Sequence, residues 1–180
     1  MNEAKLLIIG KDSYNPSNKN YTNLKIDDYP TDNVAFFPCR KEETYNLYNL
    51  TTYRRILGFI KNEKLTEIEF NKLPTPKTIA NQFMKKGVYF INALEFDLKG
   101  YTIQSKNKKN KLIFDSSTII LCFGTDAIDK FKNYENVHQF PHPSPLNNNK
   151  FWEKYDNEYS SKDYNFDYIF EQIYLPSTLK

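Results

Sequence analysis

Short runs of apolar residues, separated by polar or periodic stretches, are the main structural signal in this chain. The runs lie at residues 5–10, 34–37, 88–93, 118–123 and 137–140. A short continuous apolar run is typical of a strand that is buried on both faces of a sheet. We therefore predict a strand at each of these five places.

Helical patterns lie between the predicted strands. From residue 44 to residue 64, apolar residues recur every three or four positions, as in an amphipathic helix. Further helices are predicted at 77–86, 126–132 and 162–174. Residues 17–32 are predicted to form a long irregular segment. Strands that alternate with helices form a parallel sheet covered on both faces, so we expect one α/β domain that spans residues 1–180.

The predicted strand ends bring reactive and recognition side chains to one edge of the sheet, where ligands of such folds bind. The residues that follow these ends are Asp12, Tyr14, Phe37, Asn92, Gly124, Thr125 and His142. The amide of Asn92 can read the edge of a heterocyclic base, and the ring of Phe37 can stack on it. Asp12 is suited to orienting water, and His142 to donating to an oxygen that gains negative charge. This set fits cleavage of a bond between a sugar and an anionic leaving base.

Each of these residues also has a purely structural interpretation. Asp12 can cap the turn that follows the first strand, and Asn92 can satisfy backbone groups at a strand end. Phe37 can belong to the core, because Phe36 beside it points to the opposite face of a strand. The residues alone leave these alternatives open.

The segment His142–Leu146, with the sequence His-Pro-Ser-Pro-Leu, is predicted to be a stiff loop. Its two prolines fix the backbone φ at about −65° and remove two amide donors. The loop therefore presents an imidazole, a hydroxyl and a leucine at the end of a buried strand, where binding residues are often mounted. The structural alternative is a rigid turn without a binding role.

Composition narrows the possible classes of function. The chain has 180 residues, a net charge of +3, 39% hydrophobic and 16% aromatic residues, enough for a folded core. Cys39 and Cys122 lie in apolar runs and are expected to be buried free thiols, and no Cys/His spacing indicates a metal site. No apolar run approaches the ~18 residues of a membrane span and no signal pattern is present, so we expect a cytoplasmic protein. The basic run from Lys99 to Lys111 is expected to be a solvated loop or a surface that tracks phosphates.

Four short motifs in the chain occur in the same order as the motifs of a known protein family. They are Gly-Lys-Asp-Ser-Tyr-Asn at 10–15, Phe-Ile-Asn-Ala-Leu at 90–94, Phe-Gly-Thr-Asp-Ala at 123–127 and the segment at 142–146. The first resembles the water-activating motif of uracil-DNA glycosylases, Gly-Gln-Asp-Pro-Tyr-His. The second and third are similar to that family's Leu-Leu-Asn-x-x-Leu strand and Trp-Gly-Ser-x-Ala turn, and the last matches its DNA-intercalation loop throughout. The resemblance implies an α/β three-layer sandwich with a central four-stranded parallel sheet flanked by helices.

The resemblance also implies a role for each matching residue near the base. Asp12 would orient the attacking water and stabilise developing positive charge, and His142 would donate to the uracil carbonyl. Asn92 would read the uracil edge and Phe37 would stack on the base. Tyr14 would exclude the methyl group of thymine.

A second group of residues would contact the rest of the DNA. Leu146, next to Pro145, would wedge into the base stack that the uracil leaves. Ser144 and Thr125 would hold the flanking phosphates, which position the DNA without reading its sequence. Lys11, which stands where the family has a glutamine, would border the uracil pocket.

The chain departs from the family at several places, and these departures support a second hypothesis. Ser13 replaces a proline, Asn15 replaces a histidine, residues 40–44 replace a proline-rich loop, and 17–32 is an insertion. The first hypothesis is an active uracil-DNA glycosylase that acts on single- or double-stranded DNA. The second is a silent homologue that binds DNA, or a DNA-mimicking inhibitor protein, through the same groove. A third is a nucleotide-processing α/β enzyme unrelated to repair. The first two imply a monomer without cofactor or metal.

Overall fold

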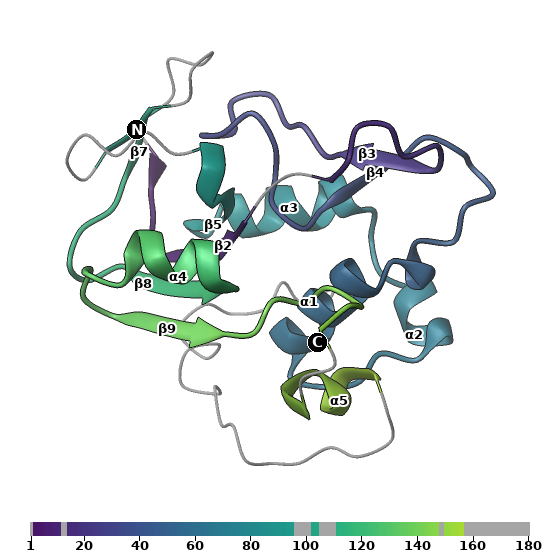
Figure 1. Cartoon of the computed structure of the whole chain (residues 1–180). Coiled ribbons are helices and arrows are strands. Elements are labelled where there is room, and N and C mark those ends of the chain that lie inside the picture. The colour runs from purple at the N-terminus through teal and green to yellow at the C-terminus, as the bar shows by residue number, and fades with distance from the viewer. Residues whose placement is uncertain (1, 12–13, 96–101, 105–110, 148–149, 157–180) are drawn as a thin grey trace.

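A parallel sheet of four strands forms the centre of the computed structural model, which describes residues 2–11, 14–95, 102–104, 111–147 and 150–156. The strand order is β5–β2–β8–β9 (Figure 1). The bounds are Val88–Asn92 for β5, Leu6–Gly10 for β2, Ile119–Phe123 for β8 and Val137–Phe140 for β9. All three pairings between neighbours are parallel. Four of the five predicted strands are thus confirmed.

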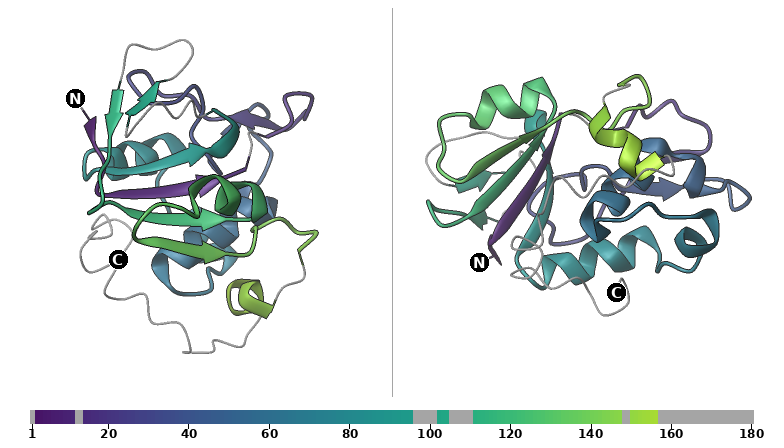
Figure 2. Two further views of the ribbon diagram at one scale, coloured as in Figure 1. Left: turned by 60° about the vertical axis from the view of Figure 1, so that its left-hand side comes forward. Right: turned by 90° about the horizontal axis from the view of Figure 1, so that it is seen from below.

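Helices cover both faces of this sheet. Figure 2 shows α4 on one face and α1 and α3 on the other, so the predicted α/β sandwich with a four-stranded parallel sheet is confirmed. The helices are α1 (Thr51–Lys61), α2 (Glu67–Asn71), α3 (Pro76–Met84), α4 (Thr125–Phe131) and α5 (Lys150–Asp156). Two 3-10 turns, η1 (Leu47–Asn49) and η2 (Ala93–Glu95), precede α1 and follow β5.

Two smaller sheets flank the centre. β1 (Asn2–Glu3) pairs in parallel with β7 (Lys111–Ile113), which pairs antiparallel with β6 (Thr102–Gln104). β3 (Tyr21–Asn23) and β4 (Pro38–Arg40) form an antiparallel pair. The segment 17–32 is therefore irregular except at β3, and the hydroxyl of Tyr29 also ties it to the backbone of Phe90 in β5.

The core between the sheet and α1 is rich in aromatic rings. Phe59 of α1 makes edge-to-face contact with Phe123 at a centroid distance of 5.2 Å, and Phe83 of α3 contacts Phe90 at 5.4 Å. All four of these side chains are buried. Full burial of a side chain of this size contributes about 1.5–3 kcal/mol, so these contacts fix α1 and α3 against one face of the sheet.

The predicted strand at 34–37 is wrong. Phe36 adopts a left-handed backbone with φ of 66°, and the amide of Phe37 donates to the carbonyl of Val34, which closes a turn. The turn is anchored on β5, because the amide of Ala35 donates to the carbonyl of Phe90 at 3.1 Å. An apolar run indicates that a segment is buried, but it does not distinguish a strand from a turn. Here the buried segment is a turn that packs into the core.

The predicted helix at 44–64 begins too early. Asn46 accepts a hydrogen bond from the amide of Tyr48 and starts η1, and Leu50 is extended with φ of −83° and ψ of 90°. The α-helix therefore starts at Thr51 and stops where Asn62 turns left-handed. The predicted helices at 77–86 and 126–132 match α3 and α4 within two residues at each end. The predicted helix at 162–174 lies outside the described residues.

The two cysteines differ in their exposure to solvent. Cys122 in β8 is buried, as predicted, but Cys39 in β4 is exposed, so the prediction of two buried thiols is wrong for Cys39. Both are free. Within the basic run from Lys99 to Lys111, residues 99–101 and 105–110 lie outside the described part of the chain.

Candidate functional site

The carboxyl ends of the four central strands meet at one rim. Gly10, the last residue of β2, pairs in register with Asn92, the last residue of β5. The loops beyond them stay together, because the amide of Leu94 donates to the carbonyl of Lys11 at 3.2 Å. On the other side, the amide of Gly124 donates to the carbonyl of Phe140 at 2.9 Å, which joins the ends of β8 and β9.

Gly124 allows His142 to sit directly against the end of β8. A Cβ atom at Gly124 would lie 3.0 Å from Cβ and 3.1 Å from Cδ2 of His142, and φ of Gly124 is 91°. Both the close approach and the left-handed backbone require glycine here. The Gly-Thr turn of the third motif and the histidine of the fourth are therefore parts of one packed unit.

The hydrogen bonds of His142 define its protonation state. The amide of Ser144 donates to Nδ1 at 3.1 Å, so Nδ1 carries no proton. Burial lowers the pKa of His142 and nearby Lys11 lowers it further, whereas Asp126 acts in the opposite direction. The imidazole is therefore neutral at pH 7, with its proton on Nε2 as a hydrogen-bond donor.

A buried arginine, Arg55, binds backbone carbonyls of the loop formed by residues 142–147. Arg55 of α1 is 7% exposed, and its Nη1 donates to the carbonyl of Ser144 at 2.7 Å. Longer bonds run to the carbonyls of Asn147 at 3.3 Å and Pro143 at 3.4 Å. Trp152 of α5 supports the loop as well, because its Nε1 donates to the carbonyl of Pro141 at 3.0 Å.

Hydrogen bonds between residues of the loop hold it together as well. The side-chain amide of Asn147 donates to the carbonyl of His142 at 3.0 Å, and the amide of Leu146 donates to Oγ of Ser144 at 3.2 Å. Leu146 is 93% exposed and Pro145 is exposed beside it. A large apolar side chain on a braced, proline-stiffened loop is available to contact a partner without rearrangement.

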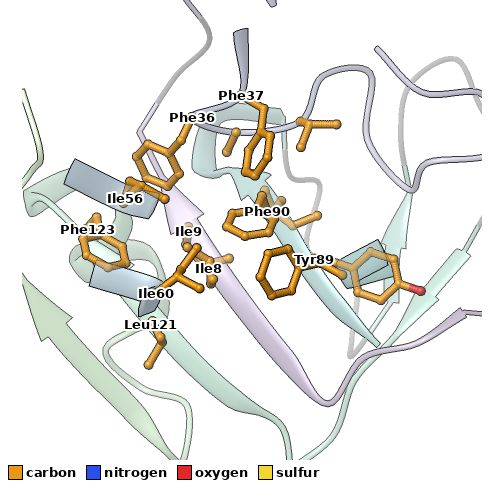
Figure 3. Close-up of a cluster of buried hydrophobic side chains, with 14 of the residues drawn as sticks. Ile8, Ile9, Phe36, Phe37, Ile56, Ile60, Tyr89, Phe90, Leu121 and Phe123 are labelled. Atoms are coloured by element: carbon orange, nitrogen blue, oxygen red, sulfur yellow. The ribbon is translucent and has the colours of Figure 1, made fainter. Parts of the chain in front are cut away.

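Phe36 and Phe37 are both buried, but Phe36 lies nearer to the residues of the rim. Figure 3 shows the two rings diverging, Phe36 toward Phe123 and Phe37 toward Phe90. Phe37 is 0% exposed, with its ring centroid 4.7 Å from that of Phe90, so the residue that we predicted as a stacking platform belongs to the core.

The ring of Phe36 lies beside two of the motifs. Its centroid is 6.5 Å from that of His142, and a Cβ atom at Gly10 would lie only 2.7 Å from its Cζ. Only a glycine at the end of β2 leaves room for this ring. The sequence offered no signal for choosing between the neighbouring phenylalanines, since the choice follows from the left-handed backbone at Phe36.

Tyr14 is fixed by the insertion. Its amide donates to Oδ1 of Asn23 at 2.5 Å, and Nδ2 of Asn23 donates back to the carbonyl of Tyr14 at 3.0 Å. The hydroxyl of Tyr14 donates to the carbonyl of Phe36. Burial raises the pKa of Tyr14 well above its ordinary value, so the phenol stays protonated as a donor. Tyr14 therefore links β3 to the backbone of Phe36.

Asn92 is buried and held by a carboxylate. Its Nδ2 donates to Oε1 of Glu95 at 2.9 Å. Glu95 also accepts from Asn33, through Nδ2 at 2.8 Å and through the backbone amide at 3.1 Å. Neither Glu95 nor Asn33 was predicted as part of the site, because no sequence pattern connects two residues 62 positions apart.

Lys11 forms an ion pair at the edge of the site. Its Nζ lies 3.3 Å from Oδ2 of Asp126, in the first turn of α4, and both side chains are about half exposed. An ion pair this exposed contributes at most about 1 kcal/mol. Thr125 next to Asp126 is exposed. Asp12 and Ser13 lie outside the described residues.

The described residues contain no cluster of three or more His, Cys, Asp or Glu side chains that is suited to a metal ion. In the same part of the chain, no helix combines the length and the apolar character that crossing a membrane requires. Comparison with protein-family models, with curated proteins and with solved structures finds no match in any of the three.

Proposed function

We propose that this chain is a uracil-DNA glycosylase-like protein that binds DNA and hydrolyses the N-glycosidic bond of a flipped-out uracil. The observation that carries the proposal is the meeting of four separate motifs at one rim, with a neutral histidine among them. Gly10 and Asn92 are in register, and Gly124 packs against His142. The buried ring of Phe36 lies beside the imidazole, with 6.5 Å between the two ring centroids.

The proposed reaction divides its work among these groups. Water adds to the sugar carbon C1′, the bond from C1′ to N1 of uracil breaks, and the electron pair leaves with the base as an anion. The Nε2–H of neutral His142 would donate to the uracil O2 as negative charge develops there. Removing a donor of this kind from such a site typically costs ~10²–10³ in rate. By its resemblance to the family motif, Asp12 would orient the water and take up its proton.

The same proposal gives the loop a role in DNA binding. Leu146 would enter the gap in the base stack, with Pro145 stiffening its backbone. Ser144 and Thr125 would contact the phosphates on either side. The bracing by Arg55 supports this role, because a loop already held in place loses little conformational entropy on binding. We extend the proposal to a monomer in the cytoplasm, where the free thiol of exposed Cys39 is stable.

A uracil-containing oligonucleotide, single- and double-stranded, tests the proposal. Strand cleavage at abasic sites would be measured with the natural chain and with Asp12→Asn and His142→Leu, singly and combined. His138→Leu is a matched control, since this second histidine lies within β9 rather than in the 142–147 loop. We expect release that falls strongly in the two site variants and is unchanged in the control. No release at high protein concentration, with folded protein, would refute the enzymatic proposal.

A silent homologue is the second candidate, and Lys11 is the residue that separates it from the first. The ammonium of Lys11 replaces a neutral amide of the family motif and lies near both Asp126 and the imidazole. Such a charge either stabilises a uracil anion or obstructs the base. The silent form would bind DNA, or an acidic DNA-mimicking inhibitor protein, without releasing uracil. Tight, salt-dependent DNA binding without release would favour this second candidate.

A further inference from the structure

We infer that Glu95 is a specificity-determining residue that fixes the orientation of the Asn92 amide, so that the site accepts uracil and rejects cytosine. This inference rests on the proposed function. Glu95 lies three residues after Asn92, on η2, and takes the hydrogen of an amide that is buried at the end of β5. It acts through Asn92 and is not proposed to touch the base.

The carboxylate of Glu95 is itself held in place. Its oxygens accept hydrogen bonds from the side-chain and backbone N–H groups of Asn33 as well as from Asn92. Asn33 is fixed in turn, because its carbonyl accepts from the hydroxyl of Thr31 at 2.8 Å, and Thr31 is fully buried. Rotating Glu95 away from Asn92 would break the bonds to Asn33 as well.

This arrangement leaves the amide of Asn92 one orientation. An ionised carboxylate only accepts hydrogen bonds, whereas a primary amide has a donating and an accepting end. The NH₂ group of Asn92 must therefore face Glu95, because a flipped amide would put its oxygen against a carboxylate oxygen. The carbonyl oxygen Oδ1 consequently lies on the side of the amide away from Glu95.

The fixed orientation of the Asn92 amide complements the hydrogen-bonding edge of uracil but not that of cytosine. Uracil carries a hydrogen on N3 flanked by carbonyl oxygens, so it complements an amide that presents an acceptor beside a donor. Cytosine has an acceptor at N3 beside an amino group, so it complements the flipped amide. Flipping costs the contact with Glu95, and a bidentate contact of this type discriminates between bases by about ten- to a hundredfold.

Glu95→Gln tests the inference with almost no change in shape. A glutamine both donates and accepts, so it permits either orientation of Asn92. The probes are two single-stranded oligonucleotides, identical except for one 2′-fluoro-2′-deoxyuridine or 2′-fluoro-2′-deoxycytidine. The fluorine withdraws electrons from the sugar and slows cleavage of the glycosidic bond, so equilibrium binding is measured whether or not the protein is catalytic. The matched control is Glu135→Gln, the same change at an exposed position before β9.

We expect the natural chain and the control to bind the uracil probe more tightly, and Glu95→Gln to reduce the ratio of the two dissociation constants by about tenfold. A role limited to stability would lower the melting temperature and leave this ratio unchanged. Asn33→Ala provides a second variant, which keeps the carboxylate but removes the side-chain donor of Asn33, and is expected to reduce the ratio less. It decides the question if Glu95→Gln does not fold.

The outcomes separate the inference from the proposed function. A natural chain that prefers uracil, together with folded variants that retain the full preference, would overturn the role of Glu95 alone. A natural chain that binds neither probe, or binds both equally, would refute uracil recognition and the inference with it.

Discussion

Replacing Arg55 with methionine should loosen the 142–147 loop while leaving the central sheet intact. Methionine keeps most of the length of the Arg55 side chain but lacks the guanidinium, which binds three loop carbonyls. A hydrogen bond from a charged donor contributes about 1.5–3 kcal/mol. The bond to Ser144 at 2.7 Å falls in this class, whereas the other two, at 3.3 and 3.4 Å, are near the limit of a hydrogen bond.

The loop carbonyls can turn toward water once Arg55 is gone, so we expect a local loss of about 2 kcal/mol, at the low end of the range for charged donors. This corresponds to opening of the loop about thirtyfold more often. The reporters are the amides of Ser144, Leu146 and Asn147, all of which donate hydrogen bonds within the loop. Their exchange with deuterium, followed by NMR, should accelerate by that factor.

Arg54→Met is the matched control for this experiment. Arg54 is the preceding residue of α1, but its guanidinium lies over the ring of Tyr48 at 4.8 Å and donates to the carbonyl of Tyr48. Both of these contacts are with Tyr48 in η1 rather than with the loop. Unchanged loop exchange in Arg55→Met, or equal acceleration in Arg54→Met, would refute the conclusion that Arg55 braces the loop.

Three further predictions follow from the described contacts. Leu146→Ala should change the free energy of unfolding by no more than about 0.5 kcal/mol, because the side chain is 93% exposed, but should weaken DNA binding under the proposed function. A thiol reagent should label Cys39 alone in the native protein and both cysteines after unfolding, since burial raises the pKa of Cys122 to about 12. Lys11→Met should raise the pKa of His142 in an NMR titration, because the charge of Lys11 lowers it. Because the folded state disfavours the charged form of His142, this residue should lower the free energy of unfolding as the pH falls below the unfolded pKa of about 6.5. Lys11→Met should weaken this dependence of the unfolding free energy on pH.

The central sheet could be predicted because its strands are buried on both faces. Leu6–Gly10 and Val88–Asn92 show this most clearly, since every residue in them is buried and the apolar runs match the strands closely. The rim at the strand ends followed from the parallel order. The same rule failed at 34–37, because an apolar run indicates burial and says nothing about backbone conformation.

The starts of two helical elements are marked by capping residues rather than by apolar periodicity. Thr66 and Glu69 form a capping box that begins α2, a pattern of Thr followed three residues later by Glu that is visible in the sequence. Asn46, a good capping residue, marks the end of the irregular stretch before η1. The apolar periodicity across 44–64 obscured the boundary at Asn46, whereas α2 begins beyond that stretch.

The supporting residues of the site could not be predicted from local patterns. Arg55 is a buried cation within an amphipathic helix, and its partners lie 88 to 92 positions further along the chain. Glu95 and Asn33 likewise meet only because the turn at 34–37 folds onto β5. Such contacts depend on tertiary packing, which short motifs do not encode.

The decisive experiment for glycosylase activity is detection of free uracil by mass spectrometry after incubation of the protein with a uracil-containing oligonucleotide. We expect the natural chain to release uracil and no other base, and His142→Leu to lose at least about a hundredfold in rate. Absence of free uracil from a folded protein, or equal release by His142→Leu, would contradict this expectation.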